Sequence, residues 1–299
     1  MKKQTSITVL GLMGWSVFME VSHFHAPGET ISASSLHAEP GGKGCNQAVA
    51  AARLGANVDF LSCMGKDAIA GECIAFMEKE RVRCHTQFTA MAASAYACIL
   101  TDSRGENRVT VHRGSADYLS REHVRSCEET IARSDILLLN NECPLETNMT
   151  ALEIAQKHGV KAILNPAPYT EVPEEYLRGF FLITPNYCEA AALTGVQTEH
   201  PPEELCIMLR KRGVERGVIT LGAKGAVAWE GEKVFSIAAE KVRVLDTTGA
   251  GDCFSAALCV SLASGADIRT AAAFAGHCSA LSVTRKHVMT ALPFREEAF

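Results

Sequence analysis

The chain has 299 residues, of which 47% are hydrophobic, and it carries a formal net charge of −5. This length and composition allow a sizeable buried core, while the lack of any basic block argues against nucleic acid or an anionic membrane as main partners. No run of about 18 apolar residues is present, so we expect no membrane-spanning helix.

The first predicted element is a buried strand at Ile7–Leu10, and short apolar runs of the same kind alternate with helix-like segments along the chain. Further strands are predicted at Val58–Cys63, Ile136–Leu139, Lys161–Leu164, Leu182–Thr184 and Val218–Leu221. Helices are predicted at Asn46–Leu54, Ala68–Glu80, Glu146–His158, Glu203–Arg212 and Asp252–Ser264. This alternation predicts one doubly wound α/β domain over residues 1–299, with a mainly parallel sheet flanked by helices.

Two segments interrupt this alternation. Val17–His37 follows the first strand without an obvious helix, and Tyr96–Val111 reads as two strands around the turn-rich "SRGEN". We expect the regions of about 15–38 and 93–113 to form a small antiparallel sheet beside the main one. Such a sheet would act as a lid or as a dimer surface.

The twelve cysteines are scattered, and no two form a C-x-x-C pair. This pattern argues against a structural zinc site and favours reduced, buried thiols in a cytoplasmic protein. The H-x-H pair of His23 and His25 would share one face of a strand, but no third metal ligand is evident. We therefore interpret the pair as part of the lid edge.

The stretch "VLDTTGAGDCFSAAL", Val244 to Leu258, combines bare backbone with one carboxylate at a predicted helix start. The amides of Gly249, Ala250 and Gly251 can form a cradle for a phosphate at the positive end of the helix dipole. Asp252 beside it is suited to take a proton from a hydroxyl during phosphoryl transfer. Simple helix capping explains an aspartate here but not the small residues before it.

Two motifs in the expected order resemble the ribokinase-like (PfkB) sugar kinases. "DTTGAGD" is similar to their C-terminal signature, and the segment from Gly41 to Asp67, which begins "GGKGCNQAVAAARLG", is similar to their N-terminal one. Shorter segments such as "LNPAP", "ITLGAKGA" and "VTRK" are similar as well. The resemblance implies a doubly wound α/β domain with a β-lid. It also implies phosphorylation of a sugar hydroxyl with ATP and Mg²⁺, so that a small sugar and ATP are the partners.

The resemblance places the sugar at "GGKGCN" and at the end of a nearby strand. Gly41 and Gly42 let backbone approach a polyol, and Lys43 and Asn46 offer hydrogen-bonding groups to its hydroxyls. Glu142 follows a predicted strand at its carboxyl end, where ligands collect in α/β sheets, although a surface-loop glutamate is the alternative. The substrate-binding set implied is Gly14, Ser16, Gly41, Gly42, Lys43, Asn46, Glu142 and Asp252.

The nucleotide and its metal are assigned to the second half of the chain. Asn186 and Glu189 are suited to hold Mg²⁺ through water, and they also fit a helix capping box. His277 lies in the predicted adenine region, Ala275–Leu281, where a packed helix histidine is equally acceptable. The cofactor-binding set implied is Asn186, Thr220, Gly222, Lys224, Gly225, Gly249, Gly251 and His277.

The sequence departs from the family pattern at two places. Ser16 and Gly14 stand where the resemblance expects an aspartate and an asparagine that bind sugar hydroxyls. The substrate therefore stays open between a sugar and a nucleoside stacked on Trp15, and a catalytically silent binding protein is a further alternative. His287 replaces a glycine after "VTRK", so a K⁺ site that includes Asp246 stays open, as does a homodimer through the lid.

Overall fold

The computed structural model describes residues 4–196 and 200–298. Nine strands form the main sheet in the order β13-β12-β11-β10-β9-β8-β1-β4-β5, with parallel pairing from β11 to β5 and antiparallel pairing at β12 and β13. The strands are β1 (Ser6–Leu10), β4 (Asn57–Gly65), β5 (Val82–Thr89), β8 (Ile136–Asn140), β9 (Lys161–Asn165), β10 (Leu182–Ile183), β11 (Arg216–Thr220), β12 (Ala226–Glu230) and β13 (Lys233–Ile237). The six strands predicted from apolar runs are confirmed.

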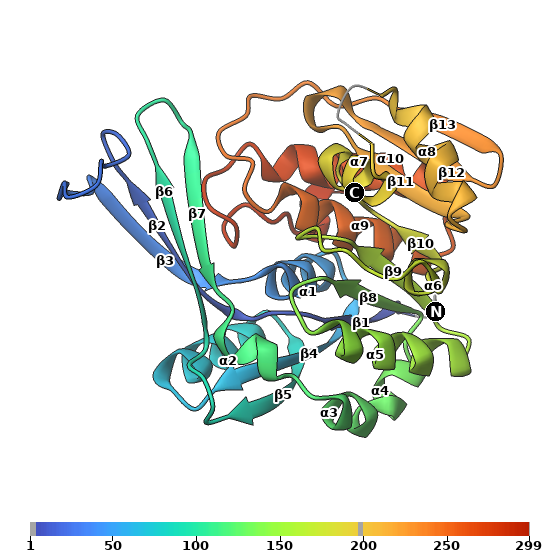
Figure 1. Cartoon of the computed structure of the whole chain (residues 1–299), viewed down its shortest axis with the longest axis horizontal. Coiled ribbons are helices and arrows are strands. Elements are labelled where there is room, and N and C mark those ends of the chain that lie inside the picture. Colours follow the sequence, from blue (N-terminus) through green and yellow to red (C-terminus); the bar gives the residue numbers. More distant parts are fainter. Residues whose placement is uncertain (1–3, 197–199, 299) are drawn as a thin grey trace.

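Helices cover both faces of this sheet (Figure 1), as predicted. Side chains alternate between two cores: Ile7 and Val9 of β1 enter one hydrophobic cluster, while Leu10 enters the other. The helices are α1 (Lys43–Arg53), α2 (Ala68–Lys79), α3 (Arg121–Ser126), α4 (Glu128–Ala132), α5 (Leu145–Lys157), α6 (Glu174–Arg178), α7 (Tyr187–Thr194), α8 (Pro202–Lys211), α9 (Ala250–Ala263), α10 (Ile268–Ser282) and α11 (Arg295–Ala298), with 3₁₀ turns η1 (Gly114–Tyr118) and η2 (Gly222–Lys224).

Two helices begin at least two residues earlier than predicted, and both are those that carry the candidate site. Helix α1 begins at Lys43 rather than Asn46, and α9 begins at Ala250 rather than Asp252. In each case a glycine at positive φ precedes the first helical residue, Gly42 at 102° and Gly249 at 76°. Because glycine adopts this conformation without steric cost, the chain turns sharply there and enters the helix at once.

The two irregular segments come together as one small sheet, hereafter the lid, which projects from the main body (Figure 1). Its strands are β2 (Gly14–Glu20), β3 (Ser35–Gly41), β6 (Ala95–Thr101) and β7 (Asn107–His112), in the order β3-β2-β6-β7. The expectation of a purely antiparallel sheet is wrong, because β2 and β6 pair in parallel. These two strands follow β1 and β5, which run in the same direction in the main sheet, so they enter the lid side by side.

The remaining expectations concern histidines, thiols and membrane helices. His23 and His25 lie in the loop between β2 and β3 of the lid, where His23 Nε2 is 2.9 Å from Glu29 Oε1, so the pair is part of the lid edge as expected. All twelve cysteines are free and nine are buried. Within the described ranges there is no cluster of three side chains able to hold a metal. Nor is any described helix both long and apolar enough to cross a bilayer.

Candidate active site

The start of α1 is pressed against the carboxyl end of β1. A side chain on Gly42 would overlap Leu12, and a Cβ on Gly44 would lie 2.6 Å from the Gly11 Cα. The Cys45 amide donates to the Leu12 carbonyl at 3.1 Å. These close backbone contacts fix the first turn of α1 at the edge of the sheet where ligands of α/β proteins bind.

Asp252 lies against this first turn, although 206 residues separate it from Asn46. The side chain is buried, with 4% exposure. Asn46 Nδ2 donates to Asp252 Oδ2 at 2.8 Å, and Lys43 Nζ lies 3.9 Å from Oδ1. The Oδ1 atom of Asn46 is buried and has no hydrogen-bond partner among the described residues. Since an orphaned buried acceptor is costly, this atom is a ready partner for a ligand hydroxyl.

A buried amide network, which the sequence interpretation missed, lies behind Asp252. Gln47 is fully buried, and its Nε2 donates to Asp252 Oδ1 at 3.2 Å and to Asn165 Oδ1 at 3.1 Å. Its Oε1 accepts from Asn140 Nδ2 at 3.2 Å, and Asn140 Oδ1 accepts from the Glu142 amide at 3.1 Å. The network therefore orients Asp252 and the loop of Glu142 together. In the sequence, the one sign of this network is the polar Gln47, which directly follows Asn46 and precedes the alanine-rich part of the same helix.

Glu142 is partly buried and points to the start of α1, where its Oε2 accepts from the Gly44 amide at 3.3 Å. Burial raises the pKa of Glu142 to about 7, against the opposing effect of Lys43. Asp252 in turn raises the pKa of Lys43, which stays a cation. The candidate sugar-binding region thus contains the carboxyl groups of Asp252 and Glu142 and the ammonium group of Lys43. Glu142 gains or loses its proton near neutral pH.

Ser16 and Gly14 lie on strand β2 of the lid, and Ser16 lies against Gly41, just before the start of α1. Ser16 is buried, and its Oγ occupies the space that a side chain on Gly41 would need. Gly14 packs against the carbonyl of Ala95, where a Cβ would overlap. Trp15 alternates with Ser16 along β2 and packs against the main hydrophobic core, so it faces away from Ser16 and does not support a stacking role.

The cradle at the start of α9 has one crowded side and one open side. A Cβ on Gly249 would lie 2.6 Å from Val288 Cγ1, whereas a Cβ on Gly251 would meet no atom of residues 4–196 or 200–298 within 4 Å. The Ala250 amide donates to the Thr247 carbonyl at 3.2 Å, which tightens the turn. Asp252 follows in the first turn of the helix, so the cradle and the carboxylate are adjacent as predicted from "GAGD".

Asn186 and Glu189 form the predicted capping box of α7. The Asn186 side chain accepts from the Glu189 amide at 2.8 Å, and Glu189 Oε2 accepts from the Asn186 amide at 2.9 Å. Burial raises the pKa of Glu189, which marks a carboxylate that a cation would stabilise. Asn186 also forms a β-bridge with Thr220, so the candidate metal and nucleotide residues meet at one edge.

The remaining nucleotide-side residues line one turn and one helix. Gly222 and Lys224 form η2, and Gly225 follows so close to the Ile237 carbonyl that a side chain would overlap it. His277 on α10 lies with its Nδ1 2.8 Å from Glu240 Oε1. This contact gives the histidine a protein partner, in keeping with the packed-helix alternative.

Asp246 organises the loop before the cradle. Its Oδ1 accepts from the amide and hydroxyl of Thr248, at 2.9 and 2.7 Å, and its Oδ2 accepts from the His287 amide at 3.0 Å. His287 has a φ of 65°, in the left-handed region that favours glycine. Both carboxylate oxygens of Asp246 are thus engaged by the protein itself.

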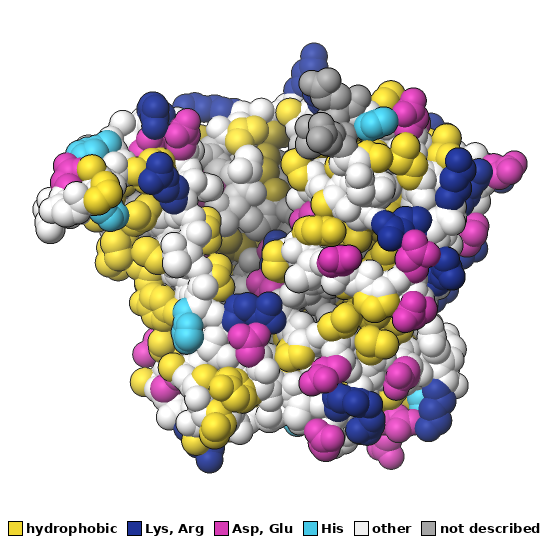
Figure 2. Space-filling model, viewed as in Figure 1, with side chains coloured by type: hydrophobic (Ala, Val, Ile, Leu, Met, Phe, Trp, Pro, Cys, Tyr) yellow, Lys and Arg dark blue, Asp and Glu magenta, His cyan; other side chains and the backbone are white. Residues whose placement is uncertain are grey.

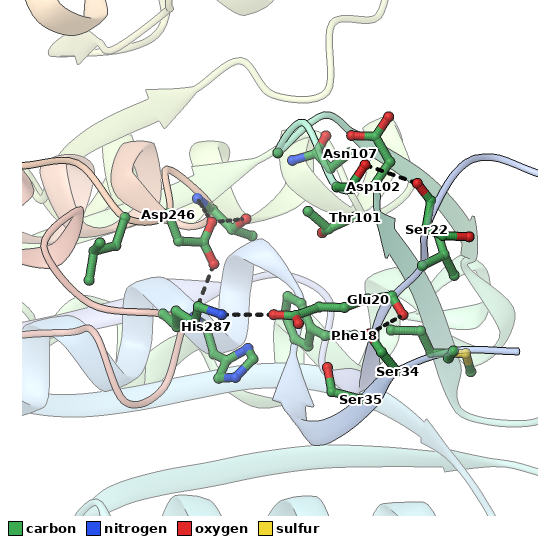
Figure 3. Close-up of a pocket in the computed structure, with 18 of the residues that line it drawn as sticks. Phe18, Glu20, Ser22, Ser34, Ser35, Thr101, Asp102, Asn107, Asp246 and His287 are labelled. Carbon is green, nitrogen blue, oxygen red and sulfur yellow. Dashed lines mark hydrogen bonds and ion pairs between the residues drawn. The ribbon is translucent and has the colours of Figure 1, made fainter.

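A hollow of about 850 Å³ separates the lid from the loops around Asp246. It is visible in Figure 2 between the lid and the main body, and Figure 3 shows Phe18, Glu20 and Ser34 facing Asp246 and His287 across it. Asp252 does not line this hollow. The hollow is therefore the gap between lid and body, next to the candidate site rather than at its centre.

Comparison with known proteins agrees with this geometry. Residues 4–295 match the profile of the pfkB family of carbohydrate kinases. A ribokinase of Haemophilus influenzae is 37% identical over 296 residues, which cover 98% of this chain and 96% of that protein. The crystal structure of Thermotoga maritima ribokinase covers 98% of both chains with a TM-score of 0.89 at 32% identity. Arabidopsis thaliana ribokinase complexed with ribose and ATP covers 99% of this chain and 97% of that one, with a TM-score of 0.87 at 28% identity. The chain therefore belongs to the pfkB family and is an ATP-dependent carbohydrate kinase.

Proposed function

We propose that the chain transfers the γ-phosphoryl group of ATP to a hydroxyl of a pentose, with Asp252 as general base. The observation that carries the proposal is the adjacency of three groups: the bare backbone run at Gly249–Gly251, the buried Asp252 carboxylate, and the partnerless Asn46 Oδ1. A polyol bound at Asn46 would place one of its hydroxyls beside Asp252, since Asn46 already bonds that carboxylate.

In the proposed reaction, Asp252 takes the proton of the attacking hydroxyl as the sugar oxygen bonds to the γ-phosphorus. The bond from that phosphorus to the bridging oxygen breaks, and ADP leaves. The Gly249 and Gly251 amides of the cradle stabilise charge on the transferred group, since the Ala250 amide is bonded to the Thr247 carbonyl, and Lys43 adds a positive charge 3.9 Å from Asp252. Mg²⁺, held through water by Asn186 and Glu189 and by the nucleotide phosphates, would neutralise phosphate charge.

The choice of a pentose follows from the pocket walls and from the relative that binds ribose. Ser16 offers an uncharged hydroxyl where the family pattern has a carboxylate. Recognition of the sugar therefore rests on Lys43, Asn46 and Glu142. The orientation of Trp15 removes the feature that favoured a nucleoside. An ADP-release assay over ribose, 2-deoxyribose, hexoses and nucleosides tests this choice, and the same assay with K⁺ or Na⁺ tests the loop at Asp246. Turnover of nucleosides alone, or of no acceptor at all, would refute the proposal.

Asp252→Asn tests the mechanism. The amide keeps the shape of the side chain and cannot accept the proton, so kcat should fall by about 10²–10⁴. ATP binding, measured by calorimetry, and the melting temperature should stay close to those of the parent protein. A variant that turns over at a near-normal rate would contradict the assignment of the base.

A homodimer through the lid is the assembly we propose. The lid exposes Leu36, Tyr96, Val109 and Val111, with 66%, 40%, 54% and 51% exposure. Sedimentation should therefore give a dimer, and Leu36→Glu should shift it toward the monomer. We also place the enzyme in the cytoplasm, where its free thiols would stay reduced.

A further inference from the structure

Among the contacts between the lid and the main body is one made by a buried carboxylate, Glu39 on β3. Its side chain has 6% exposure. Glu39 Oε1 accepts from the Val288 amide at 2.8 Å and from the Met289 amide at 3.2 Å, while Oε2 lies 3.0 Å from His37 Nε2. Backbone amides that bond a carboxylate form strong, directional contacts, and a buried carboxylate is stable only with such partners.

The segment that Glu39 holds is in contact with the cradle. Val288 is buried, and its side chain lies against Gly249, close enough that a Cβ there would be 2.6 Å from Val288 Cγ1. One residue earlier, the His287 amide donates to Asp246 Oδ2 at 3.0 Å, and Asp246 Oδ1 holds Thr248. A single residue, Val288, therefore separates the lid carboxylate from the start of α9.

Aromatic stacking adds to this contact. The His37 and His287 rings lie 3.9 Å apart and nearly parallel, and Phe18 meets His287 edge-on at 5.3 Å. Figure 3 shows His287 between Asp246 and Phe18 of the lid. The side chains of β2 and β3 that face the body thus converge on the 287–289 segment.

A second lid contact to the same segment differs in kind. Glu20 of β2 pairs with Lys286 at 2.7 Å, but their side chains are 49% and 60% exposed. This pair ends on a flexible lysine side chain rather than on backbone, so it holds the segment weakly. It provides a matched comparison, since both carboxylates lie on lid strands and contact neighbouring residues.

We propose that Glu39 is a positioning residue that couples the lid to the phosphate cradle through Val288 and Gly249. The inference rests on the proposed function and adds that the lid controls the position of the phosphate cradle. When the lid closes on the sugar, Glu39 holds Val288 against Gly249. The cradle amides therefore reach their catalytic positions only when the acceptor is bound. The residue acts through backbone and contacts neither substrate.

The test compares Glu39→Ala with Glu39→Gln and Glu20→Ala. Glu39→Ala removes the acceptor of both amides, so kcat with ATP and D-ribose should fall by about 10- to 100-fold, because a small misplacement of reacting groups has effects of that size. Hydrogen exchange in residues 246–252 should rise by about 10-fold or more as the segment opens more often. Glu39→Gln keeps one oxygen for both amides, and Glu20→Ala leaves the buried contact intact. Both should stay within about 3-fold of the parent in kcat and exchange.

Several outcomes would overturn the coupling. Parent-like kcat and exchange in Glu39→Ala would do so, and so would equal losses in all three variants, which indicate general loosening of the lid. If Glu39→Ala does not fold, Val288→Ala decides, since it removes the contact with Gly249 and leaves the lid bonded. Parent-like exchange in that variant refutes the proposal. A parent protein without kinase activity would refute the proposed function instead, and the exchange measurement would still judge Glu39.

Discussion

The two helices that form the candidate site begin in the same way and present different chemistry. Both α1 and α9 follow a glycine at positive φ, and neither has a side-chain cap. In α1 the Gly44 and Cys45 amides bond Glu142 and Leu12, so this end offers the ligand mainly side chains. In α9 the Gly251 side is bare. Side chains can distinguish one polyol from another, whereas the phosphate group is the same in every reaction and can be bound by backbone amides.

The largest effect expected from this comparison concerns the two glycines of α9. In Gly251→Ala the new methyl group meets no atom within 4 Å in the described part of the chain, so the fold should be unchanged, while the methyl group enters the proposed phosphate space. We expect kcat to fall by about 100-fold with an unaltered melting temperature. Gly249→Ala should instead lose about 1–2 kcal/mol or more of unfolding free energy, from left-handed strain and the overlap with Val288. Urea unfolding and ADP-release assays check both, and a parent-like kcat in Gly251→Ala would contradict the bare cradle.

At the start of α1, the prediction distinguishes residues that orient the general base Asp252 from residues that bind the sugar. Gln47→Met keeps the size of the side chain and removes its bonds to Asp252, Asn140 and Asn165. Loss of a hydrogen bond to a charged group should lower kcat by about 10-fold, with the sugar KM nearly unchanged. Asn46→Ala should raise the sugar KM as well, because its free Oδ1 is lost. Steady-state kinetics distinguish the two, and a purely KM effect in Gln47→Met would remove it from the positioning network.

The smallest effect concerns pH and Glu142. Its pKa is raised from 4.5 to about 7 by burial, so the carboxylate that accepts a sugar hydroxyl forms only near neutrality. The sugar KM should therefore fall as the pH rises from about 6 to 8. The native state also binds this proton more tightly than the unfolded chain, so stability should decrease as the pH rises from 4.5 toward 7.

Glu142→Gln should flatten both pH dependences, because the amide does not titrate. Glu146→Gln is the matched control, since Glu146 is an exposed carboxylate in the first turn of α5. It should leave both slopes intact. Equal slopes in the parent and in Glu142→Gln would assign the titration to another group.

The strands of the main sheet were predictable because they depend on local signals, whereas the meeting of the GGKGCN and GAGD motifs was expected only from the family resemblance. Apolar runs such as Ile136–Leu139 reveal buried strands, and glycine before a polar helix start reveals a ligand-facing turn. The roles of Gln47 and Glu39 were not predictable in the same way. Each is defined by partners far along the chain, Asp252 for Gln47 and Val288 for Glu39. The strands of the lid were predicted, but the parallel pairing of β2 and β6 was not, because a strand-like sequence pattern does not reveal the direction of pairing.

The root of the lid is built from main chain packed on main chain. Gly14 and Gly114 lie so close to the carbonyls of Ala95 and Ala93 that no side chain fits between them. Strand β2 extends six residues beyond Gly14, about 20 Å at about 3.3 Å per residue. Over this length, a rotation of about 10° at the root would carry the far end of β2 through about 3.5 Å. A movement of this size at the tip would need almost no rearrangement of the backbone contacts at the root of the lid.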